Sequence, residues 1–154
     1  MSLEDLEKRV AYLEDQLAIR NLHHEYLFQL NNKQWDDIIA TFTEDGTANI
    51  GHHGIRRGRA EVTELFKERI DKMNAGREIR DSHNAIDPVI EIDGNRAKGH
   101  WLMYIFISNP DTNETRITQG RHDCEYEKID GKWYFKSVKY TRPWPRTKDT
   151  MPKD

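Results

Sequence analysis

The chain has 154 residues, with 24 Lys and Arg against 27 Asp and Glu, for a formal net charge of −3. This balance lacks the basic excess of nucleic-acid-binding domains, and the apolar runs are too short to span a membrane. A single cysteine, Cys124, excludes an intrachain disulfide and a cysteine-based zinc site. We therefore expect one cytoplasmic domain with neither a nucleic-acid nor a membrane partner.

The N-terminal residues predict one long helix that ends at Asn31-Asn32-Lys33. Ser2 and Asp5 have the spacing of a helix capping box. An apolar seam follows at spacings of three and four, formed by Leu3, Leu6, Val10, Leu13 and Leu17. The seam rotates near residue 18, so we expect residues 1–17 to be a packing or oligomerisation extension. The remainder of the helix would cover the core.

The next segment predicts two helices and a strand. A short helix is expected from Gln34 to Phe42, a turn at Glu44-Asp45-Gly46 and a strand from Thr47 to Ile50. The clearest helical period runs from Arg59 to Met73, although Arg69 occupies one of the positions in its apolar stripe.

The C-terminal half predicts strands separated by turn signals such as Asp93-Gly94 and Asp130-Gly131. The expected strands span residues 82–92, 96–108, 116–129 and 133–141, with a bend at Pro88 in the first. Helices followed by an antiparallel meander indicate the α+β class. The main domain would span residues 18–142, and residues 143–154 would form a proline-containing irregular tail.

The strand at 96–108 is apolar on both faces. Trp101, Met103 and Ile105 lie on one face, and Leu102 and Tyr104 lie on the other. An antiparallel sheet with a solvated outer face would alternate apolar and polar residues. We therefore expect a homo-oligomer, a dimer or trimer, formed through the outer face of the sheet, unless a terminal segment of the same chain covers it.

Three runs in this order, WDDIIATFTEDG, GRAEVTELF and DGKWYF, resemble the SnoaL-like branch of the nuclear-transport-factor-2-like superfamily. The resemblance covers about residues 18–142. It implies a cone-shaped, cystatin-like fold in which a curved antiparallel sheet wraps around the N-terminal helices and encloses a pocket. Within the superfamily, the sequence is most similar to bile acid 7α-dehydratases and more distantly to scytalone dehydratases and lindane dehydrochlorinases. One such scaffold hosts many functions.

The resemblance implies a lyase site built around a histidine. His83 falls on the catalytic histidine, Tyr26 on a site tyrosine, and Arg142 on an arginine at the end of the last strand. Asn31 stands where the family has the aspartate that pairs with the histidine, and Ile105 stands where it has a second pocket aspartate. His122 falls on a pocket asparagine of the scytalone enzymes. Trp101, Met103 and Ile105 are the candidates for apolar substrate contact.

The chemistry of elimination requires a base beside an activated carbon and a donor for the leaving group. Histidine, with an unperturbed pKa of ~6.5, suits both roles. The oxygen of Asn31 can fix the tautomer of the imidazole, but a neutral amide cannot stabilise the imidazolium as a carboxylate does. From sequence alone, another carboxylate could take the place of the missing aspartate as partner of the histidine; the candidates are Asp36, Asp37, Asp81, Asp87 and Asp123.

The sequence thus predicts a cofactor-independent lyase or isomerase, dehydratase-like, acting on a hydrophobic hydroxylated ring compound. No metal is expected, because neighbouring histidines such as His23-His24 and His52-His53 do not form a chelate alone. A non-catalytic small-molecule binding protein and an assembly module of the same fold remain alternatives. A role resembling the small subunit of ring-hydroxylating oxygenases is a further one.

Overall fold

The computed structural model describes residues 1–73, 75 and 80–142. The helical segments of this part are α1 (Leu3–Asn31), α2 (Trp35–Ala40), α3 (Gly58–Thr63), a π-helical segment (Glu64–Ile70) and α4 (Asp71–Met73). The strands are β1 (Phe42–Asn49), β2 (Ile55–Arg57), β3 (Arg80–Asp93), β4 (Arg96–Asn109), β5 (Glu114–Ile129) and β6 (Lys132–Thr141). The predicted tail, 143–154, lies outside the described residues.

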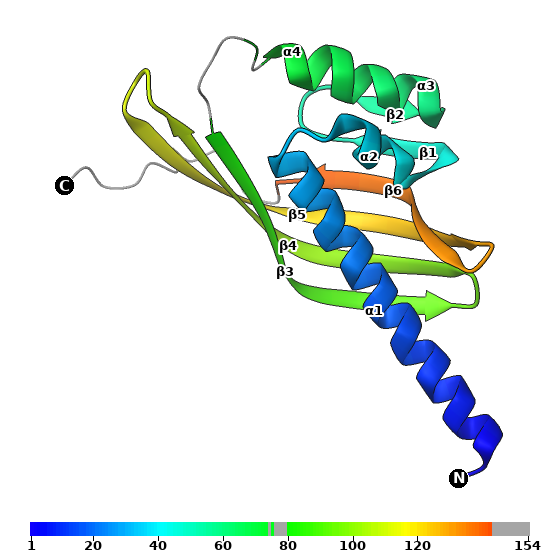
Figure 1. Ribbon diagram of the computed structural model, residues 1–154. Helices are drawn as coiled ribbons and strands as arrows, with labels where there is room; N and C mark the ends of the chain where they lie inside the picture. Colours follow the sequence, from blue (N-terminus) through cyan, green and yellow to red (C-terminus); the bar gives the residue numbers. More distant parts are fainter. Residues whose placement is uncertain (74, 76–79, 143–154) are drawn as a thin grey trace.

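The described strands form one curved, unclosed sheet in the order β2-β1-β6-β5-β4-β3. All neighbouring pairs are antiparallel except β1 with β6, which run parallel. Figure 1 shows α1 crossing one face of the sheet, while α2, α3 and α4 gather at the β1–β2 end. The predicted α+β class, with a meander from β3 to β6, is confirmed.

Helix α1 begins as its sequence predicts. Ser2 accepts a hydrogen bond from the Asp5 backbone N–H, and Asp5 accepts one from the Ser2 backbone N–H. Its N-terminal half projects past the edge of the sheet (Figure 1), and the apolar seam there is exposed: Leu3, Leu6, Val10, Leu13 and Leu17. Further along, Asp15 Oδ1 accepts hydrogen bonds from Lys128 Nζ and Trp133 Nε1, both at 2.7 Å. This carboxylate ties the helix to the β5–β6 hairpin.

The predicted turn at Glu44-Asp45-Gly46 is wrong: these residues lie inside β1. The register with β6 shifts between Phe42 and Thr47, so the turn signal marks an irregularity within the strand. A Cβ on Gly46 would lie 3.0 Å from the Thr43 carbonyl oxygen. The chain therefore needs a glycine here for close packing within the bulge.

The predicted helix at 59–73 is present, but its centre is π-helical. A π turn contains an extra residue and rotates the positions that follow it. Arg69, expected on the apolar stripe, is in fact exposed and donates to Glu64 Oε1 at 2.8 Å. Leu65 and Phe66 remain fully buried.

The predicted bend at Pro88 is also present, because the β3–β4 register shifts between Ile86 and Val89. Burial alternates along β4: Ala97, Trp101 and Met103 are buried on the inner face, whereas Leu102 and Tyr104 on the outer face are half-buried in the single chain. The core that α1 and the sheet enclose is largely aromatic; its largest fully buried side chains are Trp101, Tyr26, Tyr126, Phe42, Phe66 and Phe135. Among the described residues, no helix has the length and apolarity needed to cross a membrane.

Candidate active site

Asn31, the last residue of α1, holds His83 of β3 through three contacts. Its Oδ1 accepts a hydrogen bond from the His83 backbone N–H at 2.7 Å and lies 3.0 Å from the ring nitrogen Nδ1. Its Nδ2 donates to the His83 carbonyl oxygen at 3.2 Å. The structure therefore brings together two residues that lie 52 positions apart and that the sequence paired by resemblance alone.

These contacts determine the tautomer of His83. The backbone N–H and C=O of residue 83 cannot exchange roles, so they fix which end of the Asn31 amide is oxygen. Because that oxygen can only accept, His83 must carry its proton on Nδ1. The other ring nitrogen, Nε2, is left with a free lone pair and can act as a base.

The surroundings of His83 favour the neutral imidazole. Burial lowers the pKa of His83 below its ordinary value, and the negative charge of Asp81 opposes this shift. Asp81 lies two residues earlier on β3, hence on the same face of the strand. Among the carboxylates considered from sequence, Asp81 is the one whose charge acts on this imidazole.

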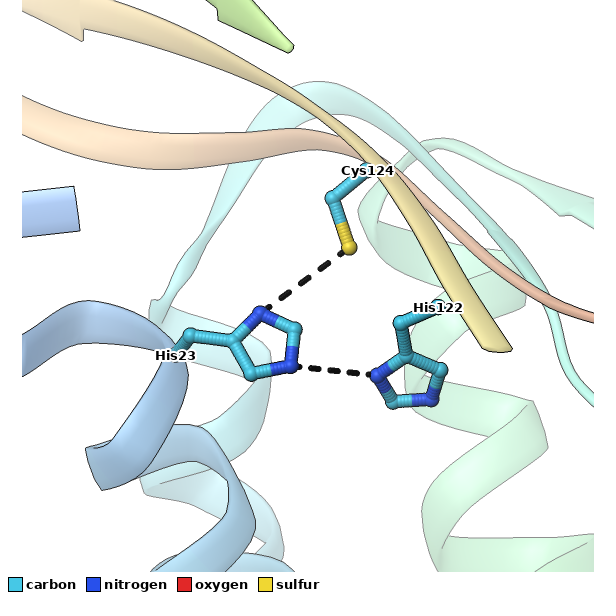
Figure 2. A group of neighbouring side chains, drawn as sticks. All are labelled: His23, His122 and Cys124. Atoms are coloured by element: carbon cyan, nitrogen blue, oxygen red, sulfur yellow. Dashed lines mark hydrogen bonds between the residues drawn. The ribbon is translucent and has the colours of Figure 1, made fainter. Parts of the chain in front are cut away.

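A buried chain of polar groups lies deeper in the interior. The indole N–H of Trp101 donates to the Tyr126 hydroxyl at 2.9 Å, and that hydroxyl lies 3.1 Å from His23 Nδ1. The other nitrogen of His23, Nε2, lies 3.2 Å from His122 Nδ1 (Figure 2). The Trp101 ring also stacks on the His23 ring, with centroids 4.1 Å apart. This series of hydrogen-bonded side chains thus connects α1 to β4 and β5.

Burial keeps both of these histidines neutral. It lowers the pKa of His122 to about 3, and His83 contributes to that shift by electrostatic repulsion. Burial likewise places the pKa of His23 well below its ordinary value. His122 is therefore an uncharged, buried group at neutral pH.

The Tyr26 hydroxyl belongs to the same interior. It is fully buried and has no hydrogen-bond partner among the described residues. The Tyr26 ring packs edge-on against the His122 ring, with centroids 6.2 Å apart. Burial raises the pKa of this phenol, so it stays protonated and can donate. A buried polar group without a partner is costly, which makes this hydroxyl a candidate ligand contact.

The remaining predicted site residues are placed by the strand register. Ile105 lies directly opposite His83 across the β3–β4 pair, and Met103 lies opposite Ala85. Met103 is fully buried and Ile105 is half-buried. The half-buried Arg142 follows directly after the end of β6. Ile105 therefore places an apolar side chain beside the His83 imidazole, at the position where the resemblance implies an aspartate in the family.

His23, His122 and Cys124 are the described residues that could hold a metal ion together. One ligand atom from each lies within 4.8 Å of the others, and all three side chains are buried. However, His23 presents Nε2 to His122 and Nδ1 to Cys124 Sγ, at 4.0 Å (Figure 2). A single ion binds only one nitrogen of an imidazole, so the two short contacts fit a hydrogen-bond chain better than a chelate.

Sequence reasoning missed His23, Tyr126 and Cys124 as neighbours of the site. The available signal was that His23 lies three residues before Tyr26, on the same face of the helix. A separate groove of about 750 Å³ opens at the β3–β4 hairpin and is lined by charged residues such as Glu91, Arg96 and Lys136. It contains none of the predicted site residues.

Residues 11–139 match the SnoaL-like domain family. The chain belongs to this family. The matched residues make up most of the chain and run from the exposed half of α1 to β6. The family assignment from sequence is thereby confirmed.

Solved structures share the fold at low sequence identity. A putative scytalone dehydratase from Novosphingobium aromaticivorans superposes with a TM-score of 0.74 at 16% identity, covering 95% of this chain and 99% of its own. The hexachlorocyclohexane dehydrochlorinase LinA-type3 from Novosphingobium barchaimii gives 0.75 at 15%, covering 88% and 91%. ActVI-ORFA from Streptomyces coelicolor gives 0.70 at 14%, covering 83% and 97%. The nuclear-transport-factor-2-like architecture is thus confirmed, and the neighbours include a dehydrochlorinase and a putative dehydratase. The particular similarity to bile acid enzymes stays a prediction.

Proposed function

We propose that this SnoaL-like protein is a cofactor-independent lyase or isomerase, most simply a dehydratase, that acts on a hydrophobic, hydroxylated ring compound. The observation that carries the proposal is the contact of Asn31 with both the backbone and the ring of His83. It leaves Nε2 unprotonated, and a general base must be unprotonated to act. The fold, shared with a dehydrochlorinase, supports the same reaction class.

The proposed reaction balances without a cofactor. His83 Nε2 removes a proton from a carbon next to an activating carbonyl, and the released electron pair moves onto the carbonyl oxygen, which becomes an enolate. The enolate returns this pair to re-form the carbonyl, the carbon–carbon double bond forms as the carbon–oxygen bond breaks, and the leaving hydroxide takes the proton back from His83 as water. Tyr26 donates a hydrogen bond to the carbonyl oxygen that becomes negatively charged, and Arg142 holds or polarises a second substrate oxygen. Enzyme protonation is unchanged at the end of the cycle.

The substrate class follows from the side chains around these groups. Met103 and Ile105 supply apolar contact on the inner face of β4. Trp101 contributes less surface, because its ring already stacks on His23 and its N–H is already hydrogen-bonded. Apolar walls with a few convergent polar groups are typical of sites for ring compounds.

The direct test is His83→Ala, assayed by mass spectrometry for loss of water from a panel of hydroxylated polycyclic ketones. Loss of a positioned general base is expected to lower kcat about 10²- to 10⁴-fold. His52→Ala is the matched control, because His52 is an exposed histidine in the 51–54 turn. Unchanged turnover in His83→Ala would remove this residue from the mechanism.

A non-catalytic binding protein is the alternative function, and the neutral Asn31 and apolar Ile105 favour it. These residues leave His83 without a directly bonded carboxylate. If the wild type and Asn31→Asp both bind a panel compound without converting it, binding replaces catalysis as the proposed function.

We also propose that the protein self-associates through apolar surface that the single chain leaves exposed. The outer sheet face presents Ile86, Val89 and Phe106 to solvent, in addition to the seam on α1. Light scattering during size-exclusion chromatography is expected to report a dimer or trimer. Phe106→Ser is expected to weaken it, and a monomeric wild type at micromolar concentration would contradict the proposal.

A further inference from the structure

We propose that His122 is held as a neutral hydrogen-bond donor whose Nε2–H binds an oxygen of the ligand. In this proposal, Trp101, Tyr126 and His23 act as positioning residues that fix the tautomer of His122. The identity of the ligand rests on the function proposed above, whereas the tautomer itself rests only on the buried contacts.

The direction of the hydrogen bonds follows from the donor at one end of the chain. An indole N–H can only donate, so Trp101 occupies one lone pair of the Tyr126 oxygen. The Tyr126 hydroxyl proton then has two neighbours, His23 Nδ1 and the Cys124 sulfur. An imidazole nitrogen is a strong acceptor and a thiol sulfur is a weak one, so the proton goes to His23.

The hydrogen bond from the Tyr126 hydroxyl to His23 Nδ1 determines which nitrogen carries the proton in both histidines. If His23 accepts at Nδ1, its single proton is on Nε2, which donates to His122 Nδ1 across 3.2 Å. His122 then accepts at Nδ1 and must carry its own proton on Nε2. Both rings stay neutral in this arrangement, as their burial requires.

The Nε2–H of His122 has no hydrogen-bond partner within the described part of the chain. Figure 2 shows this nitrogen on the side of the ring turned away from His23. The Tyr26 hydroxyl, also without a described partner, belongs to the ring packed edge-on against His122. Tyr26, whose ring packs against His122, and Asn31, which bonds His83, lie five residues apart on α1, about 7.5 Å along the helix axis.

Two neutral donors close to a base suit one chemical class of ligand group. A carbonyl or enolate oxygen accepts from such donors, and it gains most as negative charge develops on it. A carboxylate or phosphate would bring a full charge into this buried interior at much higher desolvation cost. We therefore assign His122 to the oxygen that activates the substrate carbon.

The primary test is the NMR tautomer pattern of the imidazole nitrogens in the wild-type protein at neutral pH. We expect Nε2–H with a bare Nδ1 for both His23 and His122. His23→Gln and His122→Asn serve to assign the signals. An Nδ1–H form of His122 would overturn the proposal, as would stoichiometric zinc binding that removes the His23 Nε2–H signal.

Tyr126→Phe removes the hydroxyl group that sets the direction of these hydrogen bonds and keeps the aromatic ring. We expect His23 and His122 to show mixed tautomers in this variant, while Tyr134→Phe, on β6, leaves them unchanged. Tautomers that stay fixed in Tyr126→Phe would contradict the positioning role. This measurement needs no turnover, so it can fail or succeed independently of the proposed function.

The activity test separates a donor from a structural residue. Asn at position 122 can accept from His23 through its oxygen and donate through its amide, whereas Leu can do neither. We expect His122→Asn to keep kcat within about tenfold of wild type and His122→Leu to lose a further tenfold or more. Equal kcat in the two variants would exclude a donor role at this position.

Discussion

Asn31→Asp tests how a neutral amide partner sets the protonation of His83. The substitution keeps an acceptor facing the Nδ1–H of His83, where Asn31 Oδ1 now lies 3.0 Å away. It also replaces the Nδ2 donor, which now bonds the His83 carbonyl oxygen at 3.2 Å, with a second negative oxygen. The variant therefore adds an attraction to the imidazolium and a repulsion from the carbonyl.

The expected magnitude follows from the distance. Unit charges 3 Å apart attract by roughly 5 kcal/mol at an effective dielectric constant of ~20. Desolvation of the new carboxylate and its contact with the carbonyl oxygen oppose this attraction. Opposite charges at such distances raise a histidine pKa by about 1–3 units, so we expect a rise of about two units for His83.

The sign of the stability change depends on pH. In the wild type the pKa of His83 is lowered by burial, so stability falls as pH decreases below ~6.5, where the unfolded chain takes up the proton first. Where that rise exceeds the lowering caused by burial, the pKa of His83 in Asn31→Asp lies above the unfolded value. The added stability is then fully present below about pH 6.5 and is lost as pH rises through the new pKa, at about 1.4 kcal/mol for each unit of the shift.

The measurement is an NMR titration of the His83 ring, combined with urea unfolding at several values between pH 6 and 9. Asn32→Asp is the matched control, because it places the same charge one residue away at the same helix end. The Asn32 side-chain amide donates to the Phe28 carbonyl oxygen at 2.7 Å, whereas the Asn31 amide bonds His83. A His83 pKa that stays put in Asn31→Asp, or that rises equally in Asn32→Asp, would refute the reasoning.

Two further predictions concern stability. Asp15→Ala removes the acceptor of Trp133 Nε1 and is expected to cost about 2 kcal/mol in urea unfolding, whereas its exposed neighbour in Glu14→Ala should cost less than about 0.5. Gly120→Ala would place a Cβ 2.4 Å from the Tyr140 ring and is expected to cost about 1–3 kcal/mol. Unfolding midpoints within error of wild type would contradict either estimate.

The strands of this protein could be predicted because each carries its own alternation and ends at a turn signal. The wrong prediction at Glu44-Asp45-Gly46 shows the limit of such local signals. An acidic pair followed by glycine suits a turn, but here pairing with β6 continues the strand and absorbs the irregularity as a bulge. The π-helical turn is similar, since the sequence period located the helix but not the extra residue within it.

The site divides in the same way. Asn31 and His83 could be paired from sequence because each has a place in a family pattern. His23 and Tyr126 could not, because their contact joins residues 103 positions apart and depends on the register of β5. In the sequence, His23 interrupts the apolar stripe of the helix. Only the folded structure shows that both of its ring nitrogens have hydrogen-bond partners.

The neutral partner of His83 has a consequence for the proposed reaction. When Nε2 takes a proton, the imidazolium has no carboxylate on Nδ1, so the opposite charge must come from the substrate oxygen itself. Neutral donors from His122 and Tyr26 suit that oxygen because they stabilise it without adding net charge. A carboxylate at position 31 would strengthen the base and repel the same oxygen. A rise of about two units in the pKa of His83 would increase kcat up to about 100-fold if basicity alone set the rate. Because the new carboxylate also repels the substrate oxygen, we expect kcat of Asn31→Asp to rise by less than this.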